Sequence, residues 1–250
     1  MKKQPLLSLT NIFLKVPSKE TPILNDLSLD VFKEEFIILL GSNGSGKSSL
    51  LKIINGLFSP TSGHLHLLGK DLLQSSLSQR SKSIVTLTQD LNLSTFSDLT
   101  ILENCLIALH RNKNTSPFFS SKEEQKKIKA HLHSYNPNLS EKLNMAVSTL
   151  SGGERQTLAL AMNLWNTPSL LLLDEHTSAL DPHMAKKLMY LTHETAKEKK
   201  VTTLVATHNL EDALNYGTRL IAMNQGKIVL DVSHEEKKQL TKEKLLALYS

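Results

Sequence analysis

Short apolar runs, separated by polar and turn-forming stretches, follow one another along much of this chain. Within 24–32, Leu27, Leu29 and Val31 occupy every second position, which is typical of a half-buried strand. Uninterrupted apolar runs are typical of buried parallel strands. The predicted strands are 6–16, 24–32, 36–40, 64–69, 84–88, 169–175, 201–207, 220–223 and 227–230. We expect the chain to begin with antiparallel strands, to continue with parallel ones and to end its sheets in a hairpin.

A helical period takes over between residues 98 and 150. Apolar residues recur there at helical spacing, namely at Leu99, Leu102, Leu106 and Leu109. Further along, Ser121 and Glu124 form the capping-box pattern that starts a helix. We therefore predict a single α/β core built from 1–88 and 151–230, an inserted helical subdomain at 89–150, and a C-terminal tail helix at 231–250.

The segment 41–48 carries the clearest chemical signal. It matches the pattern G-x-x-x-x-G-K-S/T and lies between the strand 36–40 and a helix predicted for 49–55. Such a turn directs backbone N–H groups at phosphate, with Lys47 on the β- and γ-phosphates and the Ser48 hydroxyl on Mg²⁺. The predicted binding residues are Gly41, Ser42, Asn43, Gly44, Ser45, Gly46, Lys47, Ser48 and Ser49. The alternative is a glycine-rich turn that binds nothing.

Two acidic residues end the apolar strand 169–175. Ligands of open α/β sheets bind at the carboxyl ends of the strands, and adjacent strand residues point to opposite sides. We therefore expect Asp174 to hold Mg²⁺, directly or through water, and Glu175 to orient or deprotonate an attacking water. The alternative is a strand end with two solvated acids.

Two further positions suggest phosphate contacts. His208 follows the strand 201–207 and is either a donor to a γ-phosphate oxygen or an ordinary structural histidine. The segment 150–156, Leu-Ser-Gly-Gly-Glu-Arg-Gln, combines the helix cap Ser151 with two glycines, which predicts a second anion site at a helix start. One ATP hardly needs two such sites, so we expect the second to act on nucleotide bound by another copy.

Composition narrows the class of protein only slightly. The 250 residues are 40% hydrophobic and 21% charged, with a net charge of +5 and a single cysteine, Cys105. The lysines are dispersed among acids without an aromatic-interleaved basic stripe, so we expect no nucleic-acid partner. A lone cysteine excludes an internal disulfide. No apolar run approaches the roughly 20 residues of a spanning helix, which predicts a cytosolic chain that reaches a membrane only through a partner.

Taken in order, these motifs resemble those of the ATP-binding-cassette (ABC) ATPases over nearly the whole length. The matching segments are the Walker A loop 41–48, the Q-loop at Gln89, the signature 150–156, the Walker B strand ending at Asp174 and Glu175, the D-loop 178–181 and the switch residue His208. The resemblance implies a P-loop NTPase fold of class α/β, with a RecA-like mixed sheet, an antiparallel β subdomain and an α-helical subdomain.

The resemblance also implies how such a chain works. Two copies would bind ATP and Mg²⁺ head to tail, each ATP lying between one Walker A loop and Ser151, Gly152 and Gly153 of the other copy. Gln89 would bind the metal and connect its site to the helical subdomain, and that subdomain would bind the cytoplasmic loops of a membrane permease. Asp181 would lie across the dimer interface. The expected catalytic residues are Glu175, His208 and Gln89.

Among the departures from the family pattern, two concern the chemistry of the site. His176 stands where proline is common, either as a tolerated loop substitution or as a titratable group that tunes the pKa of Glu175. The position that usually stacks on adenine falls on Val16, with Phe13 nearby and no tyrosine. This substitution predicts weak discrimination between ATP and GTP.

The segments 174–182 and 216–232 are similar to one bacterial subgroup of the family. Its members act with a permease and a solute-binding protein, and many are assigned to uptake of aromatic amino acids or related small solutes. The leading hypothesis is thus the ATP-hydrolysing subunit of a bacterial importer, peripheral on the cytoplasmic face of the inner membrane. One alternative is a soluble ABC ATPase without a transport role, such as the iron–sulfur-assembly type. Another is a nucleotide-binding regulatory or scaffolding module, against which Glu175 and His208 argue.

Overall fold

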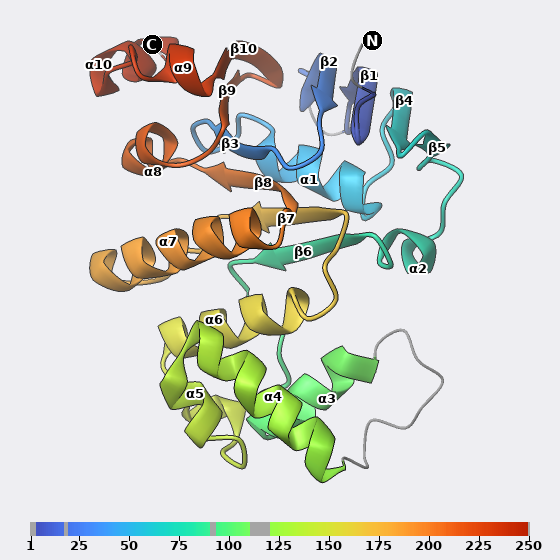
Figure 1. Cartoon of the computed structure of the whole chain (residues 1–250). Helices are drawn as coiled ribbons and strands as arrows, with labels where there is room; N and C mark the ends of the chain where they lie inside the picture. The colour runs from blue at the N-terminus through green and yellow to red at the C-terminus, as the bar shows by residue number, and fades with distance from the viewer. Residues whose placement is uncertain (1–3, 18–19, 91–93, 111–120, 250) are drawn as a thin grey trace. The chain divides into compact units, whose positions relative to one another are not determined.

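The computed structural model describes residues 4–17, 20–90, 94–110 and 121–249 (Figure 1). The chain divides into two compact units. The first takes the residues up to Thr86, the strand segment Ser169–Glu175 and the residues from Thr195 onward. The second takes Leu87–Pro168 and His176–Glu194. The chain therefore passes from one unit to the other directly after Glu175.

An antiparallel sheet opens the first unit, in the strand order β2-β1-β4-β5. Its strands are β1 (Leu7–Leu14), β2 (Leu24–Val31), β4 (Ser62–Leu67) and β5 (Lys70–Asp71). Both β1 and β2 bury alternate residues, which is the period of two predicted from the sequence. The two-residue strand β5 was not predicted, since two residues carry no periodicity.

A mixed six-stranded sheet follows, in the order β10-β9-β3-β8-β7-β6. Its strands are β3 (Phe36–Leu40), β6 (Ile84–Thr88), β7 (Leu170–Asp174), β8 (Thr202–Thr207), β9 (Arg219–Asn224) and β10 (Lys227–Ser233). Strands β3, β7, β8 and β9 pair in parallel, and β10 closes the sheet antiparallel to β9. Every residue of β3 and β8 is buried, as expected for the uninterrupted apolar run of β3, whereas β8 also buries three threonines.

The parallel strands end at a common edge, where the predicted site residues follow them. Gly41 comes directly after β3, Glu175 after β7 and His208 after β8. Three helices complete the parts of the first unit that matter here, α1 (Lys47–Asn55), α2 (Leu77–Arg80) and α8 (Leu210–Asn215). Neither α2 nor α8 was predicted, since four and six residues hold too few turns to show a helical period.

The C-terminal tail corrects one expectation. In place of a single helix over 231–250, β10 continues to Ser233, and two short helices, α9 (His234–Lys237) and α10 (Lys242–Leu246), and the 3₁₀ turn η3 (Ala247–Tyr249) follow. Ser233 starts α9 by donating its backbone N–H and hydroxyl to Glu236 Oε2, and Thr241 starts α10 by accepting from Lys244 N–H. These two caps divide the charged segment, which by composition alone resembled one helix.

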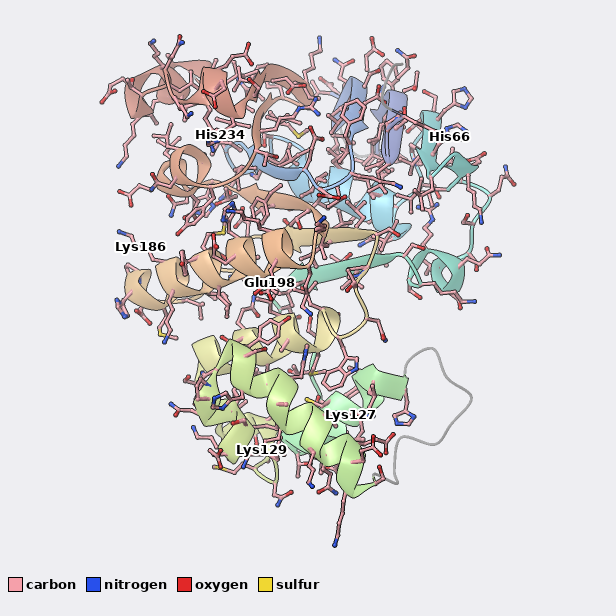
Figure 2. All side chains as sticks on the ribbon, viewed as in Figure 1. His66, Lys127, Lys129, Lys186, Glu198 and His234 are labelled. Carbon is pink, nitrogen blue, oxygen red and sulfur yellow. The ribbon has the colours of Figure 1, made fainter. Side chains whose placement is uncertain are left out.

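The second unit is mainly helical. Its elements are α3 (Ile101–His110), α4 (Lys122–Tyr135), α5 (Pro137–Glu141), the 3₁₀ turn η2 (Val147–Thr149), α6 (Gly152–Asn163) and most of α7 (Pro182–Glu198). The predicted capping box of Ser121 and Glu124 starts α4. Figure 2 shows Lys127 and Lys129 on this helix; Lys127 pairs with Glu123, and Lys129 pairs with Glu141. In the described part of the chain no helix is long and apolar enough to cross a membrane.

The buried face of α3 differs from the predicted leucine stripe. Ile101, Asn104, Cys105 and Leu106 are buried, whereas Leu102 and Leu109 are only partly covered. Asn104 is buried because its amide bonds the backbone before the helix, donating to Phe96 O and accepting from Phe96 N–H. Burial raises the pKa of the Cys105 thiol to about 12, so this cysteine is a packing residue.

Candidate nucleotide-binding site

The loop between β3 and α1 leaves its helix start open. Gly46 is the N-cap of α1 with φ 105°, and among the described residues no side chain caps this helix. A Cβ at Gly46 would lie 2.8 Å from Leu24 Cδ2 and 3.0 Å from Ile23 O, so this position requires glycine on both conformational and steric grounds. The first N–H groups of α1 thus remain available to an anion.

Lys47 is buried at the beginning of that helix. Its Nζ donates to Gly41 O at 2.8 Å and to Ser42 O at 3.1 Å, and lies 4.0 Å from Glu175 Oε1. Burial lowers the pKa of Lys47, while the charges of Glu175 and Asp174 oppose that shift. The loop therefore holds a cation against its own carbonyls, within reach of phosphate bound at the helix start.

Ser48 and Asp174 meet across the same loop. The Ser48 hydroxyl donates to Asp174 Oδ1 at 2.8 Å, and burial raises the pKa of this aspartate. A hydroxyl and a carboxylate oxygen at contact distance are the hard ligands that Mg²⁺ prefers. The pair predicted separately from two motifs is thus brought together, and its donor set fits a magnesium ion.

Glu175 lies beyond the end of β7 in a left-handed conformation, with φ 48°. Its N–H donates to Ala206 O at 3.0 Å, and its Oε1 lies 3.3 Å from His208 Nδ1. The expected reason for the separate duties of the two acids, alternation along a strand, is therefore wrong. The strained backbone at Glu175 turns this side chain toward Lys47 and His208, while Asp174 contacts Ser48.

His208 stands between β8 and α8, with 54% of its side chain exposed. The next residue, Asn209, caps α8 by accepting from Glu211 N–H at 2.8 Å and from Asp212 N–H at 3.3 Å. Asn209 was not singled out from the sequence, although an asparagine before two acids is a typical helix start. The cap sets the beginning of α8 directly after the histidine.

The signature segment belongs to the second unit and begins α6. Ser151 and Glu154 form a full capping box, with Glu154 N–H donating to Ser151 Oγ and Ser151 N–H donating to Glu154 Oε2. Lys142 Nζ contacts Glu154 Oε1 at 2.7 Å and lowers the pKa of this carboxyl. The Ser151 hydroxyl thus satisfies the Glu154 N–H, while the Glu154 carboxylate accepts from the N–H and hydroxyl of Ser151.

The D-loop lies against the signature glycines within the same unit. A Cβ at Gly152 would lie 3.4 Å from Leu180, and one at Gly153 would lie 2.5 Å from Met184 Cε. The carboxylate of Asp181 accepts from His183 N–H and Met184 N–H, both at 3.1 Å, and so caps α7. Asp181 thus has a structural duty besides the interface role that the resemblance implies.

Comparisons with known proteins agree with this geometry. The family model described as ABC transporter matches residues 24–178. The chain belongs to the ABC transporter family. A tyrosine transport ATP-binding protein of Clostridioides difficile (strain R20291) is 37% identical over 96% of this chain and 97% of its own length. The phosphonates import ATP-binding protein PhnC 1 of Haloquadratum walsbyi is 32% identical over 93% of this chain and 74% of its own length.

A solved ATP-binding cassette, a dimer in a post-hydrolysis state bound to ADP and Pi, has the same fold. It is 27% identical, with a TM-score of 0.77 over 91% of this chain and 98% of its own. The P-loop ABC ATPase fold predicted from the sequence is therefore confirmed. The chain is an ABC-type ATPase that binds and hydrolyses ATP in a transport system.

In this ABC ATPase, His176 does not tune the Glu175 carboxylate. Its side chain is buried, with 2% exposed, and its Nε2 lies 3.3 Å from Thr192 Oγ1, which itself donates to Leu188 O. Burial lowers the pKa of His176 to about 4, so the ring is neutral near pH 7. The interpretation as a titratable neighbour is wrong, and His176 is a packed residue whose backbone O accepts from the Gln156 side chain.

Two further residues of the ABC ATPase, Gln89 and Val16, were predicted for the site. Gln89 is exposed directly after β6 and belongs to the second unit, so its role at the metal stays a prediction. Val16 is half-buried beyond the end of β1 and brings no aromatic ring for adenine. Gln156 closes the signature segment, but the sequence did not indicate the contacts of its amide, which donates to Thr88 O and His176 O.

Proposed function

We propose that this ATPase is the energising subunit of a bacterial importer for an aromatic amino acid or a related small solute. The single observation that carries the catalytic part is the position of Glu175, with one carboxylate oxygen 4.0 Å from Lys47 Nζ and 3.3 Å from His208 Nδ1. The functions of the relatives, tyrosine transport and phosphonates import, support the transport part.

Each site residue of the first unit has a proposed task in hydrolysis. The uncapped N–H groups of α1 and the Lys47 ammonium bind the β- and γ-phosphates. Lys47 gives up its hydrogen bonds to Gly41 O and Ser42 O when it binds phosphate oxygens. Glu175 orients a water toward the γ-phosphorus and accepts its proton as the bond to the β–γ bridging oxygen breaks, leaving ADP and phosphate. His208 donates to a γ-phosphate oxygen.

Magnesium has ready ligands in the same unit. Ser48 and Asp174 would hold the ion, which when bound neutralises charge on the phosphates. Gln89 is the third proposed ligand, from the second unit. Burial raises the pKa of Asp174. A cation bound at this carboxylate would oppose that shift, because it favours the charged form of the carboxylate.

The signature of a second copy completes each site in this proposal. Two chains would meet head to tail, so that Ser151, Gly152 and Gly153 of one copy contact ATP bound to the Walker loop of the other, with Asp181 at the interface. The dimeric relative bound to ADP and Pi supports this arrangement. The permease would bind the helical part of the chain, which would keep the ATPase peripheral on the cytoplasmic face of the membrane.

The catalytic assignment is tested with Glu175→Gln. Losing the proton acceptor should lower kcat at least about a hundredfold while ATP still binds and draws two copies together. Steady-state ATPase activity and ATP-dependent dimerisation by light scattering measure the two effects. The matched control is Glu194→Gln, a carboxylate of α7 that pairs with His193. Hydrolysis by Glu175→Gln at the parent rate would remove Glu175 from the mechanism.

The transport assignment needs the native membrane. Chain purified with solubilised membranes should carry a permease, and cells whose chain has Glu175→Gln should lose uptake of labelled tyrosine. Labelled phosphonate serves as the comparison solute. Uptake of tyrosine that is unchanged in the variant contradicts the proposed solute, whereas absence of any membrane partner contradicts the importer.

A further inference from the structure

The C-terminal segment holds both ends of α8, the helix that follows His208. At the first turn, Lys242 Nζ contacts Glu211 Oε1 at 2.9 Å. At the other end, Lys237 Nζ donates to Tyr216 O and, at 3.2 Å, to Gly217 O. His234, which Figure 2 labels at the start of α9, also reaches Gly217 O, with Nδ1 at 3.3 Å. The short helix is thus held by contacts from α9 and α10.

Lys237 is an unusual residue in this position. Only 3% of it is exposed, and burial lowers its pKa to about 8, with no neighbouring charge contributing. A buried ammonium is costly, and an apolar side chain of similar volume is often as stable or more so. Lysine near a helix C-terminus does bond the last carbonyls, but it usually does so from the surface. Stability alone therefore gives little reason for a buried cation here.

The opposite end of α8 explains what such an anchor can do. The helix spans only six residues, about 9 Å, between its Asn209 cap and the carbonyls that Lys237 binds. His208 immediately precedes that cap, and its Nδ1 lies 3.3 Å from Glu175 Oε1. A rigid helix of this length transmits a shift at its C-terminus to the residue before its N-terminus.

We propose that Lys237 is a positioning residue for the hydrolytic step, because it anchors the C-terminal end of α8 and so fixes His208 beside Glu175. The inference rests on the proposed role of His208 and extends it to a residue outside the phosphate site. Lys237 touches neither nucleotide nor Glu175, so it acts only through the helix. ATP binding by the Walker loop does not depend on the contact between Lys237 and the end of α8.

The test compares Lys237→Met with Lys238→Met in the full-length ATPase. Lys238 is the next residue, directly after α9, and forms an exposed ion pair with Glu235. It therefore controls for the loss of a lysine charge at this end of α9. Lys237→Met should lower kcat about fivefold or more with KM for ATP unchanged, since misplacement of a catalytic group by a fraction of an ångström is costly. Lys238→Met should keep the parent kcat, and Lys237→Arg should recover most of the loss.

Two reference variants separate the possible failures. His208→Ala tells whether the histidine matters at all: parent activity in that variant contradicts the proposed site itself. If His208→Ala is inactive and Lys237→Met keeps the parent kcat, the positioning role of Lys237 is wrong. A thermal melt checks folding, and if Lys237→Met does not fold, Lys237→Gln takes its place, with a lower kcat at constant KM supporting the role and parent kcat overturning it.

Discussion

Two helices of this ATPase begin at glycine-containing loops, yet their N-termini are capped differently. Helix α1 starts at Gly46, in a left-handed conformation and without a side-chain cap among the described residues, beside the buried cation Lys47. Helix α6 starts at Ser151, whose hydroxyl accepts from the Glu154 N–H while the Glu154 carboxylate accepts from the Ser151 N–H. The first loop has no capping side chain at its helix start, whereas the second has a capping hydroxyl and a carboxylate beside it.

This difference agrees with the different parts that the proposed head-to-tail dimer gives to the two loops. A permanently open start suits the loop that holds nucleotide in each copy. A capped start suits a loop that would meet an anion only when another copy presents it, because the cap stabilises the helix start in the isolated chain.

The largest effect is expected from alanine at Gly46, in the first of the two loops. Gly46→Ala forces a side chain into a left-handed position against Leu24 and Ile23, so the loop must shift. We expect ATP affinity to fall at least about a hundredfold and the free energy of unfolding to fall by about 1–3 kcal/mol. Gly152→Ala, whose Cβ meets only ordinary contact with Leu180, is the matched variant and should fold like the parent. Calorimetry with ATP and thermal melts measure both.

A second prediction concerns the cap of α6. Ser151→Ala should lower the free energy of unfolding by about 1 kcal/mol and leave ATP binding by a single copy unchanged. ATP hydrolysis, which needs both copies in the proposed dimer, should fall because the donor to the partner's nucleotide is lost. Ser121→Ala removes an equivalent capping box from α4 and should cost similar stability with full hydrolysis. Equal hydrolysis in the two variants would mean that Ser151 is only a cap.

Glu154→Gln should produce a smaller change of the opposite sign. Removing the negative charge from the start of α6 should strengthen ATP-dependent dimerisation about two- to fivefold, since the carboxylate no longer opposes the incoming phosphate. Sedimentation at a series of ATP concentrations measures this. Weaker dimerisation would show that the acidic cap orders the loop for its ligand.

The pH dependence of stability reports on the same cap. The pKa of Glu154 is lowered in the folded chain, chiefly by its hydrogen bond to Lys142. Its contribution to stability is therefore complete above the unfolded value of 4.5 and disappears as the pH falls through the lower folded value. The difference in unfolding free energy between the parent and Glu154→Gln should shrink below pH 4.5. Denaturant titrations from pH 7 to 3 would detect a constant difference if the pair contributed nothing.

The smallest effect is expected at the nucleotide base. The chain has Val16 at the position predicted for adenine stacking, and this residue is half-buried without an aromatic ring. Because stacking contributes little there, GTP should replace ATP with less than about a fivefold change in KM. A steep preference for ATP in a nucleotide competition assay would show that other groups read the base.

Sequence patterns were sufficient for the elements that are long or strictly periodic. The buried strands β3, β7 and β8, the capping box of α4 and the closing hairpin lie where the apolar pattern and the cap residues indicated. The pattern failed where tertiary contacts decide burial. The stripe on α3 runs through Asn104 instead of Leu102, because an amide that satisfies the preceding backbone outweighs a leucine at the surface.

The phosphate site likewise contains residues that the local sequence indicates and contacts that only the tertiary structure forms. Its glycines, Lys47 and Ser48 are local requirements of a strand–turn–helix unit, so they could be recognised from eight consecutive residues. The contacts of Glu175 could not, since they depend on a left-handed backbone and on a histidine from another strand.

The amino-acid sequence by itself determined the family, the phosphate loop and the order of the motifs, because backbone chemistry and spacing act over short segments. Only the tertiary structure decided which of these residues meet. It joined Ser48 to Asp174, turned Glu175 toward His208, made His176 a neutral packed residue and set a buried Lys237 at the end of α8. The physical reason is that pairing and burial depend on residues far apart in the chain, which no local pattern encodes.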